Sequence, residues 1–111
     1  HLMNGSRFAQ MKPGAFFVNV SRGGLVDENA LYDALENGHL AGAALDVFDP
    51  EPPAKENALL HRDDVFVTPH VAGVTVASRE RMWRMALSLA LQLWNNQKPD
   101  HIVNPEVLLF T

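Results

Sequence analysis

The sequence has no cysteine among its 111 residues, which excludes disulfide bonds and thiolate metal sites. That composition is compatible with a reducing cytoplasm, which is the location we expect. Positive charge is also scarce: nine Lys and Arg residues stand against 13 Asp and Glu residues, so no nucleic-acid-binding face is expected. No apolar run is long enough to cross a membrane, and the five histidines show no metal-ligand spacing, so neither a membrane segment nor a metal site is predicted.

What the sequence does contain is an alternation of strand and helix patterns. An apolar run over residues 15–20, broken only by Asn19, predicts a buried strand in a sheet that is covered on both faces. A helical pattern over residues 27–38 follows, and further strands are predicted over residues 40–48 and 65–68. Strand, helix and strand in so short a stretch form a βαβ unit, which predicts the α/β class with parallel strands.

The remaining segments are predicted from caps, prolines and helical spacing. Residues 4–11 are typical of a short helix, and residues 49–53 cannot be regular because three of the five are prolines. Residues 75–96 form a long amphipathic pattern whose apolar stripe nearly encircles its second half, so we expect this helix to pack on more than one side. The tail over residues 102–110 is apolar but has no obvious sheet partner in this chain.

A polar turn directly follows the first predicted strand. Ser21 and Arg22 come after it, and Gly23 and Gly24 can turn the backbone tightly and close to a bound molecule. Open α/β sheets bind ligands outside the carboxyl ends of their strands. The guanidinium of Arg22 has the shape to grip a carboxylate with two parallel hydrogen bonds. The alternative is a surface arginine at an ordinary strand-to-helix turn.

Asp46 lies near the end of the second strand, and His70 lies just past the third. Because the carboxyl ends of parallel strands lie at one edge, we expect both residues and Arg22 to face one crevice, with Glu51 within reach. A glutamate beside a histidine fixes the imidazole tautomer and favours its protonated form, which suits a general acid or base. The alternatives are a loop histidine bonded to backbone, an exposed loop acid and an aspartate in a structural pairing.

Six motifs carry a resemblance that covers Leu2 to about Val107. In their order and spacing the sequence resembles the D-isomer-specific 2-hydroxyacid dehydrogenases, which implies hydride transfer between NAD or NADP and a small D-2-hydroxy acid or its 2-keto acid. The motifs are M-K-P-G-A (11–15), V-N-V-S-R-G-G-L-V-D-E (18–28), A-L-x-x-A-L-x-x-G (30–38), A-G-A-A-L-D-V-F (41–48), E-P-P (51–53) and T-P-H-V-A-G (68–73).

The resemblance also implies a role for each candidate residue. Arg22 is the position that binds the carboxylate and carbonyl of the 2-keto acid. His70 is the acid–base group that protonates the carbonyl oxygen, and Glu51 supports that histidine. Asp46 is implied to bond the nicotinamide carboxamide. The resemblance implies that backbone lines the nicotinamide side of the cofactor site, around Val20, Ser21, Arg22, His70 and Gly73.

The resemblance further implies an incomplete domain, because the family's glycine fingerprint and ribose-binding acid would lie upstream of Leu2. Residues 1–74 would be the C-terminal half of a dinucleotide-binding domain, a Rossmann-type doubly wound parallel sheet. Residues 75–97 would be an interdomain helix, and residues 98–111 a tail that belongs to the substrate domain. We expect the chain to be inactive alone, and to work with the missing N-terminal half in a homodimer.

Two alternatives stay open at this stage. One is a non-catalytic protein that senses NAD and binds partners, as the corepressors of this family do. The other is an inactive fragment that only associates with a partner chain. The arginine, glutamate and histidine do not separate these possibilities, since the corepressors keep all three.

Overall fold

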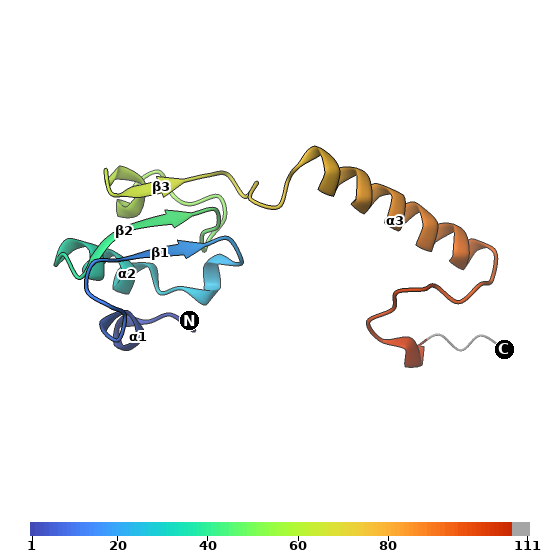
Figure 1. Cartoon of the computed structure of the whole chain (residues 1–111), viewed down its shortest axis with the longest axis horizontal. Coiled ribbons are helices and arrows are strands. Elements are labelled where there is room, and N and C mark those ends of the chain that lie inside the picture. The colour runs from blue at the N-terminus through green and yellow to red at the C-terminus, as the bar shows by residue number, and fades with distance from the viewer. Residues whose placement is uncertain (108–111) are drawn as a thin grey trace. The chain divides into compact units, whose positions relative to one another are not determined.

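The structure, a computed structural model, describes residues 1–107 and divides into two compact units between Ala72 and Gly73 (Figure 1). The first unit contains α1 (Gly5–Ala9), β1 (Ala15–Asn19), the 3-10 turn η1 (Gly23–Leu25), α2 (Glu28–Glu36), β2 (Leu40–Leu45), the 3-10 turn η2 (Ala58–His61) and β3 (Val65–Val67). The second contains α3 (Val76–Trp94) and the 3-10 turn η3 (Pro105–Val107). The predicted α/β class is confirmed, and the last four residues of the predicted tail lie outside the described residues.

The three strands form a parallel sheet in the order β1-β2-β3, as the βαβ pattern predicts. The register pairs Asn19 with Leu45, and Leu45 with Val67. These are the last residues of the three strands, so all three strands end at the same edge of the sheet. The segments that follow them therefore leave the sheet side by side.

Capping side chains fix where the helices of the first unit begin. The Oδ1 atom of Asn4 accepts a hydrogen bond from the backbone N–H of Arg7 at 3.2 Å, and that of Asp27 accepts from the N–H of Ala30 at 3.1 Å. Each bond satisfies a backbone donor that has no partner inside its helix. Gly38, at a φ of 72°, follows α2 in the left-handed conformation that favours glycine.

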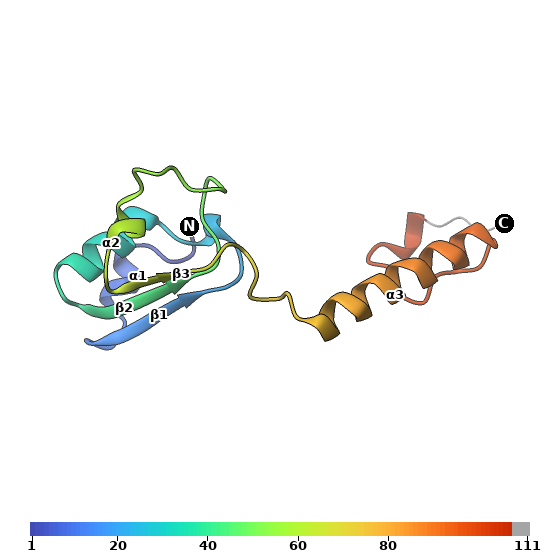
Figure 2. The same cartoon turned by 90° about the horizontal axis from the view of Figure 1, so that it is seen from above.

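The hydrophobic core lies between the sheet and the two helices α1 and α2, which both cover one face of it (Figure 2). Its most deeply buried large side chains are Phe8, Leu31 and Leu59. The ring of Phe8 packs edge-on against the ring of Phe17, with 5.2 Å between the centroids. The apolar faces of α1, α2 and the sheet thus account for the stability of this unit.

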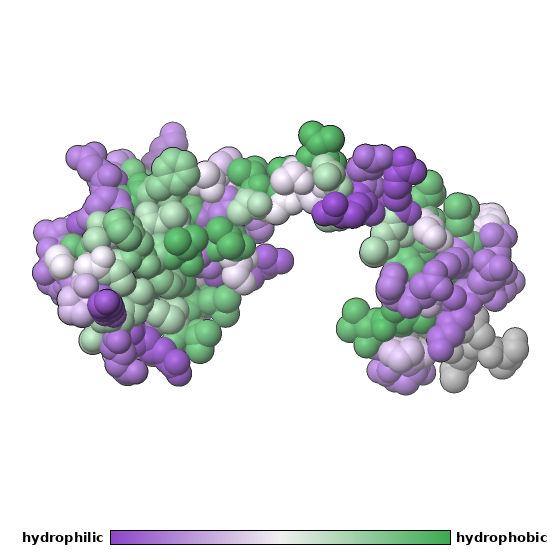
Figure 3. Space-filling model, viewed as in Figure 1, coloured by the Kyte–Doolittle hydropathy of each residue, from purple (hydrophilic) through white to green (hydrophobic). Residues whose placement is uncertain are grey.

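The opposite face of the sheet is bare, so residues 1–107 do not themselves supply the predicted cover over this second face. Phe16, Val18 and Phe66 are 72%, 62% and 70% exposed. They point away from α1 and α2 because successive side chains of a strand alternate between its two faces. A hydrophobic patch accordingly gathers over the three strands in Figure 3.

In the second unit, Thr75 and Ser78 form a capping box at the start of α3. Among the described residues α3 contains no buried residue, so the expectation that this helix packs on more than one side stays a prediction about structure outside this chain. Its apolar positions, which include Trp83 and Trp94, have too little other structure in this unit to cover them. Within residues 1–107, no helix has both the length and the apolar character needed to span a membrane.

Candidate active site

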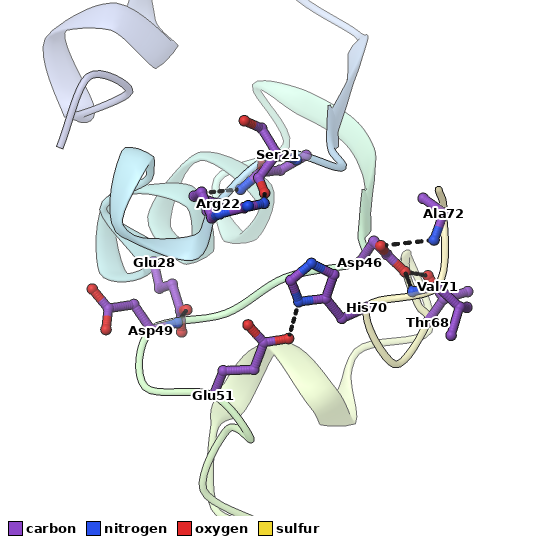
Figure 4. A network of polar contacts seen from close by, with 11 residues as sticks. Ser21, Arg22, Glu28, Asp46, Asp49, Glu51, Thr68, His70, Val71 and Ala72 are labelled. Atoms are coloured by element: carbon purple, nitrogen blue, oxygen red, sulfur yellow. Dashed lines mark hydrogen bonds and ion pairs between the residues drawn. The ribbon is translucent and has the colours of Figure 1, made fainter. Parts of the chain in front are cut away.

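A glutamate and a histidine are hydrogen-bonded to each other at the strand-end edge of the sheet (Figure 4). The Nδ1 atom of His70 lies 2.8 Å from the Oε1 atom of Glu51, and both side chains are partly exposed. Because an ionised carboxylate can only accept, Nδ1 carries the proton of this bond. Within residues 1–107 the Nε2 atom has no hydrogen-bond partner, so it can exchange a proton with a bound molecule.

The backbone of His70 is held in an uncommon conformation. Its φ of 54° lies in the left-handed region, which costs free energy for residues other than glycine. Its N–H donates to the carbonyl oxygens of Asp46 at 2.9 Å and Thr68 at 3.1 Å. These bonds fix the turn after β3, and with it the direction of the imidazole.

Asp46 is almost fully buried, and its carboxylate clamps the same turn. Its Oδ1 atom accepts from the hydroxyl of Thr68 at 2.5 Å and from the N–H of Val71 at 2.8 Å, and its Oδ2 atom accepts from the N–H of Ala72 at 2.9 Å. Burial raises the pKa of Asp46, but those hydrogen bonds and the charge of His70 outweigh it and hold the pKa below the usual 3.8. The group therefore stays ionised at neutral pH.

One alternative for Asp46 was that it pairs with other groups of the chain for structural reasons, and these three hydrogen bonds show that it does. Its predicted contact with a nicotinamide carboxamide stays a prediction. A carboxylate has about four acceptor positions, and Asp46 uses three of them within the chain. One position, on Oδ2, is left for an amide donor.

Arg22 follows β1 at the same edge, and its side chain is exposed. Its Nη1 atom donates to the carbonyl oxygen of Ser21 at 2.6 Å. Within the described residues, no hydrogen bond or ion pair joins Arg22 to Glu51 or His70. The predicted grip of Arg22 on a substrate carboxylate therefore stays a prediction.

Asn19 builds the turn that carries Arg22, a role that the sequence analysis missed. Its side-chain Nδ2 donates to the carbonyl of Arg22 at 3.0 Å, and its Oδ1 accepts from the N–H of Ser21 at 3.1 Å. The signal was available, because an amide buried inside an apolar strand must find partners. Thr68, whose hydroxyl bonds Asp46, was also missed, and its position at a strand end gives no comparable signal.

The other predicted positions are placed as follows. Val20 is 58% exposed at the end of β1, next to Ser21. Gly73 belongs to the second unit, where its carbonyl accepts from the hydroxyl of Ser78 at 2.7 Å. Their predicted contacts with a cofactor stay predictions. No group of three or more acidic or histidine side chains within residues 1–107 is arranged to hold a metal ion.

Chemically, this edge offers a histidine held by a carboxylate, a nearby guanidinium that can reorient and a buried anionic clamp. An open pocket of about 480 Å³ adjoins it on the side of Glu51, and most of its lining is apolar: Phe48, Pro52, Pro53, Val67 and Pro69 beside Asp46, Glu51 and Thr68. The arrangement suits transfer of a proton to or from a small polar molecule.

Comparisons with known proteins agree on one kind of protein. The family model for the "D-isomer specific 2-hydroxyacid dehydrogenase, NAD binding domain" matches residues 1–72. The chain is 41% identical over 108 residues to a glyoxylate reductase from Thermofilum pendens, covering 97% of this chain and 32% of the relative. It is 48% identical over 82 residues to an (S)-sulfolactate dehydrogenase from Chromohalobacter salexigens, covering 74% of this chain and 26% of the relative.

A crystal structure gives the same result. The D-isomer specific 2-hydroxyacid dehydrogenase from Xanthobacter autotrophicus Py2, in complex with NADPH and MES, matches with a TM-score of 0.78 at 37% identity. The match covers 96% of this chain and 43% of that structure. The chain thus spans about a third or less of the length of the two curated relatives.

Proposed function

The chain belongs to the D-isomer specific 2-hydroxyacid dehydrogenase family, and from that premise we propose that it carries the acid–base site of an NAD(P)-dependent enzyme. The reaction would interconvert a small D-2-hydroxy acid and its 2-keto acid. The observation that carries the proposal is the 2.8 Å pair between Glu51 and His70, which leaves the Nε2 atom of the imidazole without a partner in the described chain.

His70 is the proposed acid and base. Reduction of a 2-keto acid requires a proton on the carbonyl oxygen as it becomes a hydroxyl. The Nε2–H of a protonated His70 would give that proton, and neutral Nε2 would take it back during oxidation. Glu51 would hold Nδ1 through both directions and stabilise the imidazolium by its negative charge.

Arg22 is the proposed clamp for the substrate carboxylate. The fork of a guanidinium can donate two parallel hydrogen bonds to a carboxylate, and its fixed charge would also polarise the neighbouring carbonyl. The side chain is exposed and bonded only to the carbonyl of Ser21 among the described residues, so a carboxylate can replace that bond without breaking an ion pair.

When bound, a nicotinamide cofactor supplies the hydride. The residues fit such a group: Asp46 keeps one acceptor position for the carboxamide, and Val20 presents an exposed apolar side chain. The further positions proposed to line the nicotinamide side are Ser21, Arg22, His70 and Gly73. Both NAD and NADP are candidates, since the family model names NAD and the Xanthobacter structure holds NADPH.

We further propose that this site works with segments equivalent to the rest of those relatives, including a substrate domain, in a homodimer. Residues 1–74 would belong to the nucleotide-binding domain, residues 75–97 would be an interdomain helix, and residues 98–111 would return to the substrate domain. The bare sheet face at Phe16 and Phe66 and the unburied α3 support this, because large exposed apolar patches mark surfaces that bind other structure. Light scattering on a full-length protein that carries this chain tests the dimer.

The decisive experiment compares His70→Gln with the parent in such a full-length protein, with glyoxylate and NADH or NADPH as probes. We expect kcat to fall by about 10²- to 10⁴-fold, the usual contribution of a positioned acid–base group. The Kd for the cofactor should change little, because the substitution removes the proton donor and keeps the backbone at position 70, which is the part proposed to line the nicotinamide side.

His101→Gln is the matched control, since His101 is exposed and lies in the other unit. It should leave turnover unchanged. Parental turnover in His70→Gln would remove that residue from the acid–base role. A parent that binds NADH but turns over no 2-keto acid would favour the non-catalytic, NAD-sensing alternative instead.

A further inference from the structure

The loop that carries Glu51 has little hydrogen bonding of its own. Three of the five residues from Asp49 to Pro53 are prolines, which have no N–H to donate. Within this loop, taken as residues 49–57, one backbone hydrogen bond joins the N–H of Asn57 to the carbonyl of Ala54, at 3.0 Å. From η2, the N–H of Leu60 bonds the carbonyl of Asn57 at 3.0 Å, and the imidazole of His61 bonds the carbonyl of Lys55 at 2.7 Å. None of these bonds involves the stretch from Asp49 to Pro53 that contains Glu51. The position of the Glu51 carboxylate therefore depends on what holds the two ends of this loop.

Glu28, the first residue of α2, bonds both ends at once. Its Oε1 atom accepts from the backbone N–H of Asp49 at 3.0 Å, and its Oε2 atom accepts from the side-chain Nδ2 of Asn57 at 2.6 Å. Glu51 lies between these two anchor points, two residues after Asp49. Figure 4 shows Glu28 beside the start of the loop and Glu51 farther along it, facing His70.

Both anchors lead into the core of the first unit. The Oδ1 atom of Asn57 accepts from the N–H of Leu59, whose side chain is 1% exposed. Glu28 itself is half-buried at the start of α2, where the partial positive charge of the helix end favours a carboxylate. Because α2 packs on the sheet, these anchors tie the loop to the same compact unit that contains His70.

We propose that Glu28 is a positioning residue for the acid–base couple: its carboxylate fixes the loop through Asp49 and Asn57, so that Glu51 meets the imidazole of His70. This inference rests on the proposed function of that couple. Glu28 touches neither His70 nor any reacting atom, and it acts only through the loop.

The test combines Glu28→Ala with Glu51→Gln in a double-mutant cycle, in a full-length protein that carries this chain. We expect Glu28→Ala to lower kcat on the order of 10- to 100-fold, as a displacement of about 1 Å does for a catalytic group. The double variant should be no slower than Glu51→Gln alone, because both changes remove the same contact. If the fold-losses in kcat of the two single variants multiply in the double variant, Glu28 acts independently of Glu51, and the proposal is overturned.

A second readout does not depend on turnover. In the 111-residue chain, the imidazole ¹⁵N signals of His70 report whether Nδ1 donates to a carboxylate. Glu28→Ala should move these signals toward those of Glu51→Gln, whereas Glu56→Ala, which removes an exposed acid from the same loop, should leave them in place. Unmoved signals in Glu28→Ala would overturn the inference even in an active enzyme. An inactive parent with moved signals would instead refute the proposed function alone.

A swapped pair keeps the test decisive if Glu28→Ala does not fold. Glu28→Gln sets an amide N–H₂ against the N–H₂ of Asn57, which breaks that anchor. Adding Asn57→Asp restores a donor facing an acceptor and keeps an oxygen for the N–H of Leu59. Recovery of the His70 signals and of kcat in the swapped pair is expected, and failure to recover either one would contradict the proposal.

Discussion

Gly23→Ala is the substitution whose effect the structure defines most sharply. A Cβ atom at Gly23 would lie 2.0 Å from both the carbonyl carbon and the carbonyl oxygen of Phe48, and 2.6 Å from the backbone nitrogen of Asp49. Ordinary contact begins at 3.4 Å. The obstacle is backbone rather than a flexible side chain, so the strand-to-loop segment itself has to move by more than an ångström.

The expected cost follows from what that movement breaks. Overpacking of a filled site costs about 1–3 kcal/mol, and a backbone obstacle places Gly23→Ala at about 3 kcal/mol of unfolding free energy for the first unit. The same shift carries Glu51, because Asp49 begins its loop. A displacement of about 1 Å would lengthen the 2.8 Å bond to His70 beyond hydrogen-bonding range and lower kcat by about 10²-fold.

The control is the neighbouring glycine. A Cβ at Gly24 would meet only the far end of the Asp49 side chain, at 3.0 Å, and the residue is exposed. Gly24→Ala should therefore change the unfolding free energy by less than about 0.5 kcal/mol. Hydrogen exchange of the α2 amides, followed by mass spectrometry, measures that free energy. Tryptophan fluorescence cannot, because Trp83 and Trp94 both lie on α3 in the other unit. Equal protection in the two glycine variants would refute the close-packing argument.

The remaining predictions concern the charged groups of the site. Arg22→Lys in a full-length protein should lower kcat/KM for a 2-keto acid by about 10- to 100-fold, as the loss of one charge-assisted hydrogen bond does, with an unchanged Kd for the cofactor; unchanged kcat/KM would argue against the clamp. Because the pKa of Asp46 is lowered by folding, its stabilisation is complete above pH 3.8 and disappears as the pH falls through the native pKa. Asp46→Asn should therefore be less stable at neutral pH and lose less stability on acidification, measured by acid unfolding; parallel curves for the two proteins would contradict this. Asp64, whose pKa is lowered by its hydrogen bonds with Arg62 and by the charge of that residue, should contribute to the acid dependence that remains.

The elements of the first unit could be predicted because their signals are local. Asn4 and Asp27 cap helices in the way that short polar side chains before apolar periodicity indicate. Parallel pairing followed from the length of the βαβ connection. The covering of the sheet could not be predicted from this chain, because Phe16 and Val18 have the same apolar character whether or not other structure packs on them.

The candidate site could likewise be predicted from the sequence only in part. That Glu51 and His70 meet could be inferred from strand ends at one edge, since both follow strands of a parallel sheet. The supporting residues were harder to find. Glu28 and Asn57 are 29 residues apart and belong to different elements, so no spacing pattern in the sequence predicts their hydrogen bond. The direction of the Arg22 side chain was also beyond prediction, because an exposed long side chain has many rotamers of similar energy.

The left-handed backbone at His70 limits what can be learned from replacing it. At a φ of 54°, histidine, asparagine and aspartate are tolerated better than most side chains, and β-branched residues least. Most substitutions there would disturb the chain path as well as delete the imidazole. Asparagine is therefore the replacement that separates the two effects, and the gap in activity between His70→Asn and His70→Gln would measure how far main-chain geometry, apart from chemistry, restricts this position.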